Sequence, residues 1–278
     1  MIIDFHTHAF PDKIAASAIT ILEGNGKVNA NTDGTVMDLQ NKAREAGVDY
    51  SLVLPVVTAP KQTKSINDFA IKINFDNDIY PNILSFGGIH PDYLEYEDEL
   101  IRIKDAGLKG IKLHPEYQST YIDDEKYVKI IDKAFELGLI VIIHAGIDIG
   151  IDSDLKASPD RILNCKSKLK NNGIFVLAHM GSWKMWNEVY DKILGKDFYI
   201  DTAFSLGDIY KEDEKIEMLK ENDIISFINK HSADKILFGT DSPWAKQKQY
   251  IDFMNNLNIS KENLNKIMGL NAKKLLNL

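Results

Sequence analysis

The sequence predicts one (β/α)₈ barrel domain that spans residues 1–278. Short runs rich in β-branched residues alternate with amphipathic stretches at intervals of roughly 35 residues, as in a chain of βα units. Several of these runs are apolar almost throughout, which is typical of parallel strands buried on both faces. Eight such units with right-handed crossovers predict a closed barrel. An open doubly wound sheet is the alternative, but no Gly-x-Gly-x-x-Gly motif follows the first run.

The expected elements follow from this alternation. The eight strand candidates are residues 2–6, 49–54, 83–89, 110–114, 139–144, 174–179, 198–201 and 235–239. The amphipathic stretches between them predict crossover helices at residues 37–46, 66–74, 98–106, 126–137, 157–170 and 216–229. After the eighth strand, helices are expected at residues 246–256 and 260–276, the second with Ser260 as its N-cap.

One long segment, residues 9–36, shows no regular pattern after the first strand. It is rich in glycine, asparagine and aspartate, which predicts a loop with at most a short helix at residues 15–22. A loop of this length in a compact domain is typical of a functional lid or of disorder.

Composition excludes several classes of partner. The chain is 44% hydrophobic. Its formal charge of −8 opposes sequence-independent binding of phosphate groups, so nucleic acid is not expected as a partner. No apolar run approaches the roughly 18 residues of a membrane span, and no basic leader precedes the first strand. We therefore expect a cytoplasmic protein with a small-molecule substrate, and the single Cys165 agrees with that compartment. The sequence leaves open whether the chain forms a homo-oligomer.

The tripeptide His6-Thr7-His8 at the end of the first strand indicates half of a metal site. In an extended strand alternate side chains share a face, so the two imidazoles can bind one ion with bonds of about 2.1 Å. Asp4 is expected on the same face, one step deeper. The spacing alone is weak, because two histidines at i and i+2 also arise by chance.

Other polar residues also stand where strands end, and a barrel carries its chemistry at that mouth. Asp241 follows the eighth strand. Six of the seven histidines lie at strand ends, and only His231 falls outside; the six are His6, His8, His90, His114, His144 and His179. Taken singly, His90 and His114 fit a structural, hydrogen-bonded role better than a functional one. Four imidazoles and a carboxylate gathered at one mouth favour a metal site.

These elements resemble the amidohydrolase-related branch of the amidohydrolase superfamily, which includes aminocarboxymuconate-semialdehyde decarboxylase and many metal-dependent hydrolases. The matching segments cover essentially the whole chain; they are residues 4–8, 110–115, 141–144, 178–181, 199–202, 238–243 and 269–276. The resemblance implies that His6, His8, His144 and Asp241 hold one divalent ion, usually zinc. It also implies that His179 contacts the water or the substrate as the catalytic imidazole.

The chemistry of these residue types agrees with that division. Three neutral imidazoles and a carboxylate suit zinc, which lowers the pKa of a bound water toward about 7. The resulting metal-bound hydroxide would act as the nucleophile, and Asp241 would accept its proton and deliver it to a leaving group. The sequence therefore predicts a zinc-dependent hydrolase of a small-molecule amide, cyclic amide or lactone-like carbonyl.

Three other functions remain as alternatives. A non-oxidative decarboxylase on the same scaffold is the first, although only Arg44, Arg102 and Arg161 are available as guanidinium groups and only Arg161 is expected near the mouth. A TatD-like nuclease is less favoured, because that group uses a glutamate where this chain has Lys112. A metal-stabilised binding protein without catalysis is the third.

The substrate-binding residues predicted from the sequence are Lys112, His114 and Trp183. Lys112 and His114 point inward from the fourth strand, and Lys112 is expected to be a free ammonium that binds a substrate carboxylate. The alternative is a carbamylated Lys112 that bridges two metal ions. Trp183 follows the sixth strand, where an indole can wall a pocket or simply pack under a loop. Asp201 is expected to cap its strand or to support the site.

Overall fold

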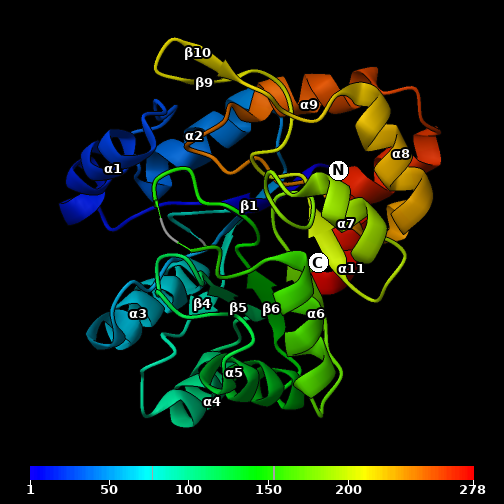
Figure 1. Cartoon of the computed structure of the whole chain (residues 1–278). Coiled ribbons are helices and arrows are strands. Elements are labelled where there is room, and N and C mark those ends of the chain that lie inside the picture. Colours follow the sequence, from blue (N-terminus) through cyan, green and yellow to red (C-terminus); the bar gives the residue numbers. More distant parts are fainter. Residues whose placement is uncertain (77, 153) are drawn as a thin grey trace.

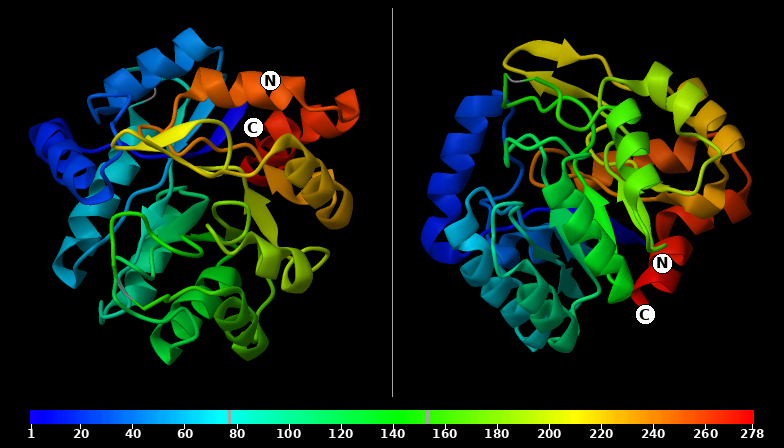
Figure 2. Two further views of the ribbon diagram at one scale, coloured as in Figure 1. Left: turned by 45° about the horizontal axis from the view of Figure 1, so that its top comes forward. Right: turned by 60° about the horizontal axis from the view of Figure 1, so that its bottom comes forward.

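Nine parallel strand segments form a ring with the helices outside it (Figures 1 and 2). The computed structural model describes residues 1–76, 78–152 and 154–278. Its parallel strands are β1 (Ile3–Thr7), β2 (Tyr50–Val53), β3 (Ile83–Ser85), β4 (Gly87–Gly88), β5 (Gly110–Leu113), β6 (Ile140–Ile143), β7 (Phe175–Leu177), β8 (Tyr199–Asp201) and β11 (Ile236–Leu237). The expected third strand is thus divided into β3 and β4.

Backbone hydrogen bonds close the ring. Strands pair in the orders β1-β2-β3 and β11-β8-β7-β6-β5-β4. At the first junction, between β3 and β4, Phe86 N donates to Val53 O of β2 at 3.1 Å. At the second junction Phe5 N donates to Phe238 O at 2.8 Å, and Asp241 N donates to His6 O at 2.8 Å. The predicted (β/α)₈ barrel is confirmed.

The helices account for most of the remaining chain. They are α1 (Asp12–Gly26), α2 (Val36–Ala46), α3 (Thr63–Phe75), α4 (Tyr96–Asp105), α5 (Glu125–Glu136), α6 (Pro159–Lys168), α7 (Trp186–Lys192), α8 (Glu221–His231), α9 (Gln247–Asn256), α10 (Lys261–Asn265) and α11 (Asn271–Leu276). A π-helical turn, Lys266–Leu270, joins α10 to α11. Ser260 caps α10 as predicted, accepting from Asn263 N at 3.1 Å. Among the described residues, no helix is long and apolar enough to cross a bilayer.

Two expectations about these segments were wrong. Residues 9–36 are not mainly a loop, because Asp12–Gly26 forms the full helix α1, which ends at Lys27 in a left-handed conformation. Gly24 and Gly26 lie within the last turn of the helix, and Lys27, which follows them, takes the left-handed conformation that glycine usually adopts at this place. The helix expected at residues 216–229 begins only at Glu221, because Ile216 belongs to a hairpin of β9 (Ile209–Lys211) and β10 (Glu214–Ile216). Neither this hairpin nor α7 was predicted.

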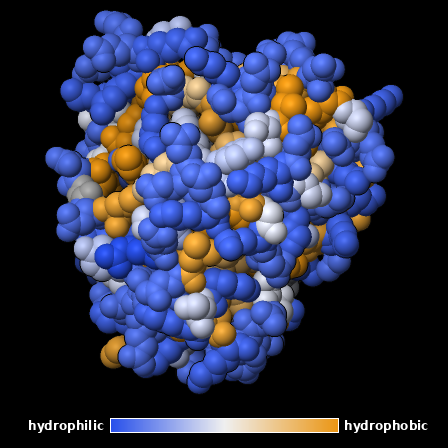
Figure 3. Space-filling model, turned by 45° about the vertical axis from the view of Figure 1, so that its right-hand side comes forward, coloured by the Kyte–Doolittle hydropathy of each residue, from blue (hydrophilic) through white to orange (hydrophobic). Residues whose placement is uncertain are grey.

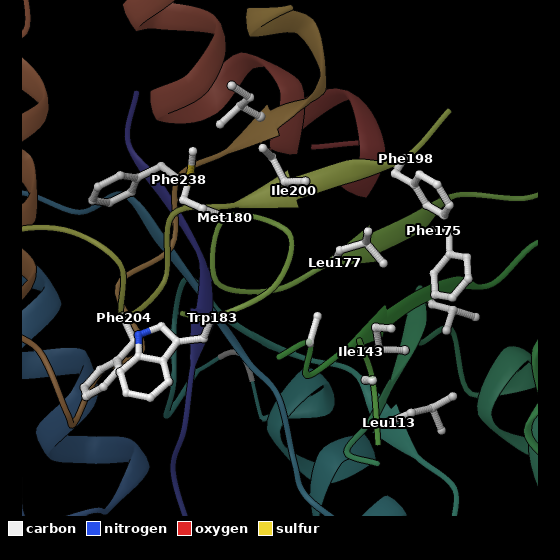
Figure 4. Packing of buried hydrophobic residues seen from close by; sticks show 14 of the residues in the cluster. Leu113, Ile143, Phe175, Leu177, Met180, Trp183, Phe198, Ile200, Phe204 and Phe238 are labelled. Carbon is white, nitrogen blue, oxygen red and sulfur yellow. The ribbon is translucent and has the colours of Figure 1, made fainter. Parts of the chain in front are cut away.

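Alternation along the strands separates two layers of core. Leu113, Ile143, Leu177 and Ile200 lie side by side on β5 to β8 and belong to the larger cluster, which also includes buried helix residues (Figure 4). The opposite strand face supplies the smaller cluster inside the ring, formed by Ile3, Phe5, Leu52, Leu54, Phe86, Ile140, Ile142, Val176 and Leu237 with two residues of α11. The inner cluster fills the barrel below the strand ends, so polar groups gather above it. The surface in Figure 3 is mostly hydrophilic, with small hydrophobic patches.

Candidate active site

His6 and His8 both direct Nε2 toward Asp241 Oδ1 at the end of β1. The His6 Nδ1 lies 2.8 Å from Asp201 Oδ2, and the His8 Nδ1 lies 2.8 Å from Leu54 O. A carboxylate and a carbonyl can only accept, so each Nδ1 carries a proton, and in the neutral imidazole Nε2 then has the lone pair. This is the state in which an imidazole binds a metal.

Asp241 lies against both of these nitrogens. Its Oδ1 is 3.2 Å from His6 Nε2 and 3.0 Å from His8 Nε2, and the three atoms lie within 4.8 Å of one another. Burial alone would raise the pKa of Asp241, but the neighbouring His6 and His8 hold it well below its ordinary value. Asp241 is therefore an anion that is held by the Nε2–H groups of two imidazoles, and without those protons the same three atoms form a donor set that suits a divalent cation.

His179 and His144 form a second linked pair. The His179 Nδ1 lies 3.0 Å from Ala203 O, so its Nε2 is unprotonated and accepts from His144 Nδ1, also at 3.0 Å. This fixes the His144 proton on Nδ1 and leaves a lone pair on His144 Nε2, which is buried without a hydrogen-bond partner among the described residues. His179 thus uses both ring nitrogens within the protein, whereas His144 keeps one for a ligand.

The backbone is strained at two of these positions. His179 has φ 63° and Asp241 has φ 69°, a region that residues other than glycine seldom adopt. Hydrogen bonds hold both: Trp186 Nε1 donates to His179 O at 3.2 Å, and Asp241 N donates to His6 O. Such strain concentrates at functional sites, where the surrounding structure fixes an unfavourable geometry.

Lys112 lies at the floor of this site. It is 1% exposed, and its Nζ is 3.3 Å from His6 Nε2. Burial lowers the pKa of Lys112 to about 8, and the carboxylates of Asp201 and Asp241 oppose this fall. At neutral pH the group is therefore still mostly an ammonium, and a carboxylate is the natural counter-charge for it.

The structure adds Asp148, which was missed from the sequence. His114 stacks on His144 with ring centroids 4.2 Å apart, and Asp148 Oδ2 lies 3.6 Å from His114 Nε2 and 3.9 Å from His144 Nε2. These three residues form a second group whose ligand atoms lie within 4.8 Å of one another. Burial raises the pKa of Asp148 to about 6. No motif marks Asp148, because it comes from the loop after β6 rather than from a strand end.

Two other polar residues of the first strands lie apart from this site. The register of β1 shifts between Asp4 and Thr7. Asp4 therefore does not share the face of His6 as predicted, and accepts instead from Thr240 Oγ1 at 2.6 Å and from Gln247 Nε2 of α9 at 2.8 Å. His90 accepts from Asp92 N at 3.1 Å and does not line the pocket.

His231 and Arg161 lie outside the site and have structural roles. His231 bonds Gly195 N and Phe198 O. Arg161 pairs with Asp123 at 2.9 Å and is not among the residues that line the pocket. The arginine expected near the mouth therefore does not reach the site.

A pocket of about 750 Å³ opens above the polar cluster. It is lined at its floor by the histidines, Lys112 and Asp241, and at its walls by residues of α1 and α3 and by Trp183, Phe204 and Trp244. The rings of Trp183 and Phe204 lie 5.7 Å apart (Figure 4). Trp183 therefore lines the pocket, and its role in substrate binding stays a prediction.

Comparison with known proteins agrees with this architecture. The chain belongs to the amidohydrolase family Amidohydro_2, whose model matches residues 3–278. No curated protein matches the chain. The predicted family is thereby confirmed, and a metal-dependent enzyme of this superfamily is the class of function that it supports.

Solved structures share the fold at low sequence identity. A 2,6-dihydroxybenzoate decarboxylase complexed with 2,6-dihydroxybenzoate has a TM-score of 0.70 at 15% identity, covering 100% of this chain and 99% of that one. An uncharacterised TIM-barrel protein from Bordetella bronchiseptica has a TM-score of 0.72 at 17% identity, covering 99% and 98%. A dihydroxybenzoic acid decarboxylase from Polaromonas sp. JS666, with bound manganese and the inhibitor 2-nitroresorcinol, has a TM-score of 0.69 at 15% identity, covering 100% and 97%.

Proposed function

We propose that this member of the amidohydrolase family is a metal-dependent non-oxidative decarboxylase of an unsaturated or aromatic carboxylic acid. The observation that carries the proposal is the buried ammonium of Lys112, 3.3 Å from His6 Nε2 at the floor of the pocket. The nearby carboxylates of Asp201 and Asp241 are already engaged by His6 and His8, so a substrate carboxylate would supply a direct ion-pair partner for Lys112, which a neutral amide or lactone would not. Two of the three structural neighbours described above are named as decarboxylases, which supports this reaction over the hydrolysis favoured by the sequence.

One divalent ion fits the residues present. His6 Nε2, His8 Nε2 and Asp241 Oδ1 converge, and the buried lone pair of His144 Nε2 lacks a partner among the described residues. We propose these four residues as the ligands, with zinc as the ion because imidazoles dominate the set, although one structural neighbour holds manganese. The ion would supply Lewis-acid polarisation of the substrate.

The protein's own groups would then orient the substrate and move one proton. Lys112 would bind the carboxylate, and the aromatic wall of Trp183 and Phe204 would hold the planar part of the acid. Loss of CO₂ breaks the bond between the carboxyl carbon and the ring or alkene carbon, which must gain a proton in its place. Asp241 is an anion, so we propose that it first accepts a proton from solvent water and then delivers that proton to this carbon. His179, whose ring nitrogens are bonded to Ala203 O and to His144 Nδ1, would orient His144.

Isotopes distinguish decarboxylation from hydrolysis in one experiment. Protein loaded with zinc or manganese is incubated with a panel of hydroxybenzoates and unsaturated acids in D₂O, and CO₂ and product mass are measured. The proposal predicts CO₂ release and one deuterium at the carbon that lost the carboxyl group. A parallel panel of amides and lactones in H₂¹⁸O tests the other reaction. Incorporation of ¹⁸O into a product without CO₂ release would replace the decarboxylase with a hydrolase.

A further inference from the structure

The pocket is divided into a charged floor and an uncharged wall. Among the described residues that line it, every imidazole, carboxylate and ammonium comes from a strand end or from the loop after β6. The lining residues from α1, α3 and the segment after β2 carry no charge, and most of them are apolar. A ligand that fills this space would therefore be polar at one end only.

Helix α1 presents an apolar face to this pocket. Ile14, Ala18, Ile21 and Leu22 line it, and their spacing of three or four residues places them on one side of the helix, with the uncharged polar Ser17 and Asn25 beside them. Ile14 is 50% exposed and Ile21 is 62% exposed. Ala15 and Ile19, on the adjacent side of α1, are the residues buried against the protein. The pocket face of α1 is therefore apolar without being needed for packing.

Helix α3 continues the same uncharged wall. Ile66 and Phe69 line the pocket one turn apart, and α3 lies on the same side of the barrel as α1 (Figure 1). Ile147 and Ile149, from the loop after β6, extend it at the level of the mouth. The cavity of about 750 Å³ lies in the upper part of the range of about 300 to 1,000 Å³ found for drug-sized ligands. A single-ring acid would occupy the floor and leave the wall uncovered.

We infer that the substrate is an amphiphilic carboxylic acid, whose carboxylate lies on the floor and whose elongated apolar group lies against α1 and α3. The carboxylate end rests on the proposed function, whereas the apolar end rests on the wall alone. The apolar group is an alkyl chain or a further aromatic ring, because both have the surface that this wall would remove from water.

Equilibrium binding tests both ends separately. Zinc-loaded protein is titrated calorimetrically with benzoate and its para-ethyl, para-butyl and para-hexyl derivatives, below their aggregation concentrations. Affinity should rise about two- to fourfold for each added methylene group, as expected for progressive burial of apolar surface. Para-phenylbenzoate forms the aromatic arm of the same series. A steeper gain for the phenyl group than for an alkyl group of similar size would identify an aromatic extension.

Variants of α1 test where the apolar group lies. Ala18→Trp places an indole in the pocket, and Ala16→Trp places the same indole on the exposed side of the helix, away from the lining residues. Ala18→Trp should weaken para-hexylbenzoate at least tenfold and leave benzoate unchanged, and Ala16→Trp should change neither. A milder pair of variants changes less volume. Ile21→Ser should lower the affinity for para-hexylbenzoate about threefold. Ile79→Ser should leave this affinity unchanged, because Ile79 is also exposed but lies outside the pocket.

The outcomes separate this inference from the proposed function. Affinity that does not depend on chain length, or equal losses in Ala18→Trp and Ala16→Trp, would overturn the inference. The matching para-alkylbenzamides lack the charge. If they bind as tightly as the benzoates and show the same dependence on chain length, the apolar wall is supported and the carboxylate end, with the decarboxylase proposal, fails.

Discussion

Replacing Asp201 with asparagine should weaken metal binding by His6, although none of the proposed ligands is itself replaced. Asp201 is fully buried, and its Oδ2 accepts from His6 Nδ1 at 2.8 Å. Its other oxygen, Oδ1, accepts from the backbone N–H groups of His179 at 2.9 Å and Ala203 at 3.1 Å. All three partners are therefore donors, and only a group with two acceptor oxygens satisfies them together.

Asparagine has one acceptor and one donor. Two backbone donors face the Oδ1 position, so the amide oxygen should stay there and the amide NH₂ should face His6 Nδ1. That nitrogen must then accept, which moves the His6 proton to Nε2, the atom that lies beside Asp241. A protonated Nε2 cannot bind a metal. Substitutions that act through a ligand's hydrogen-bond partner typically weaken metal binding about 10- to 100-fold, or about 1.4 to 2.8 kcal/mol.

The assay is competition for zinc and for manganese against a chelator of known affinity, with the ¹⁵N shifts of the His6 ring as a second readout. The shifts should report the Nδ1–H tautomer in the wild type and the Nε2–H tautomer in Asp201→Asn. Asp123→Asn is the control, because it removes a partly buried carboxylate that pairs with Arg161 and Asn164 away from the pocket. Metal affinity in Asp201→Asn within twofold of the wild type, with the His6 tautomer unchanged, would refute the reasoning.

Three further outcomes are expected. Purified protein should carry about one divalent ion per chain by elemental analysis, and the double variant His6→Ala, His8→Ala should lose it; full retention would contradict the ligand assignment. His179→Asn removes the partner of His144 Nδ1, so it should weaken metal binding by no more than about 10- to 100-fold and, with metal in excess, still lose about 10²- to 10⁴-fold in turnover. His144→Ala should lose the metal, and equal metal loss in the two variants would make His179 a ligand. Lys112→Met should mainly raise KM for an anionic substrate at constant metal content; a fall in metal content, with bicarbonate promoting reconstitution, would instead indicate a carbamate on Lys112.

Much of the fold could be read from the sequence because parallel strands in a barrel are local, apolar and regularly spaced. Almost every strand and crossover helix that the alternation predicts is present in the structure, from β1 to α11. The errors lie where local composition and tertiary context disagree. The glycines in residues 9–36 suggested a loop, yet two of them end α1, and residues 209–216 pair with each other as a hairpin although nothing in their pattern demanded it.

The sequence by itself determined which residues stand at the strand ends, and therefore that His6, His8, His179 and Asp241 meet at one mouth. Tertiary structure alone decided which nitrogen of each imidazole carries the proton, because the partners are distant in sequence: His6 bonds Asp201, and His179 bonds Ala203. It also decided that Asp4 turns toward α9. The apolar face of α1 is visible in the sequence, but only its position above the barrel makes it a pocket wall. Periodicity fixes the face of an element, whereas the contacts of that face depend on how distant segments pack.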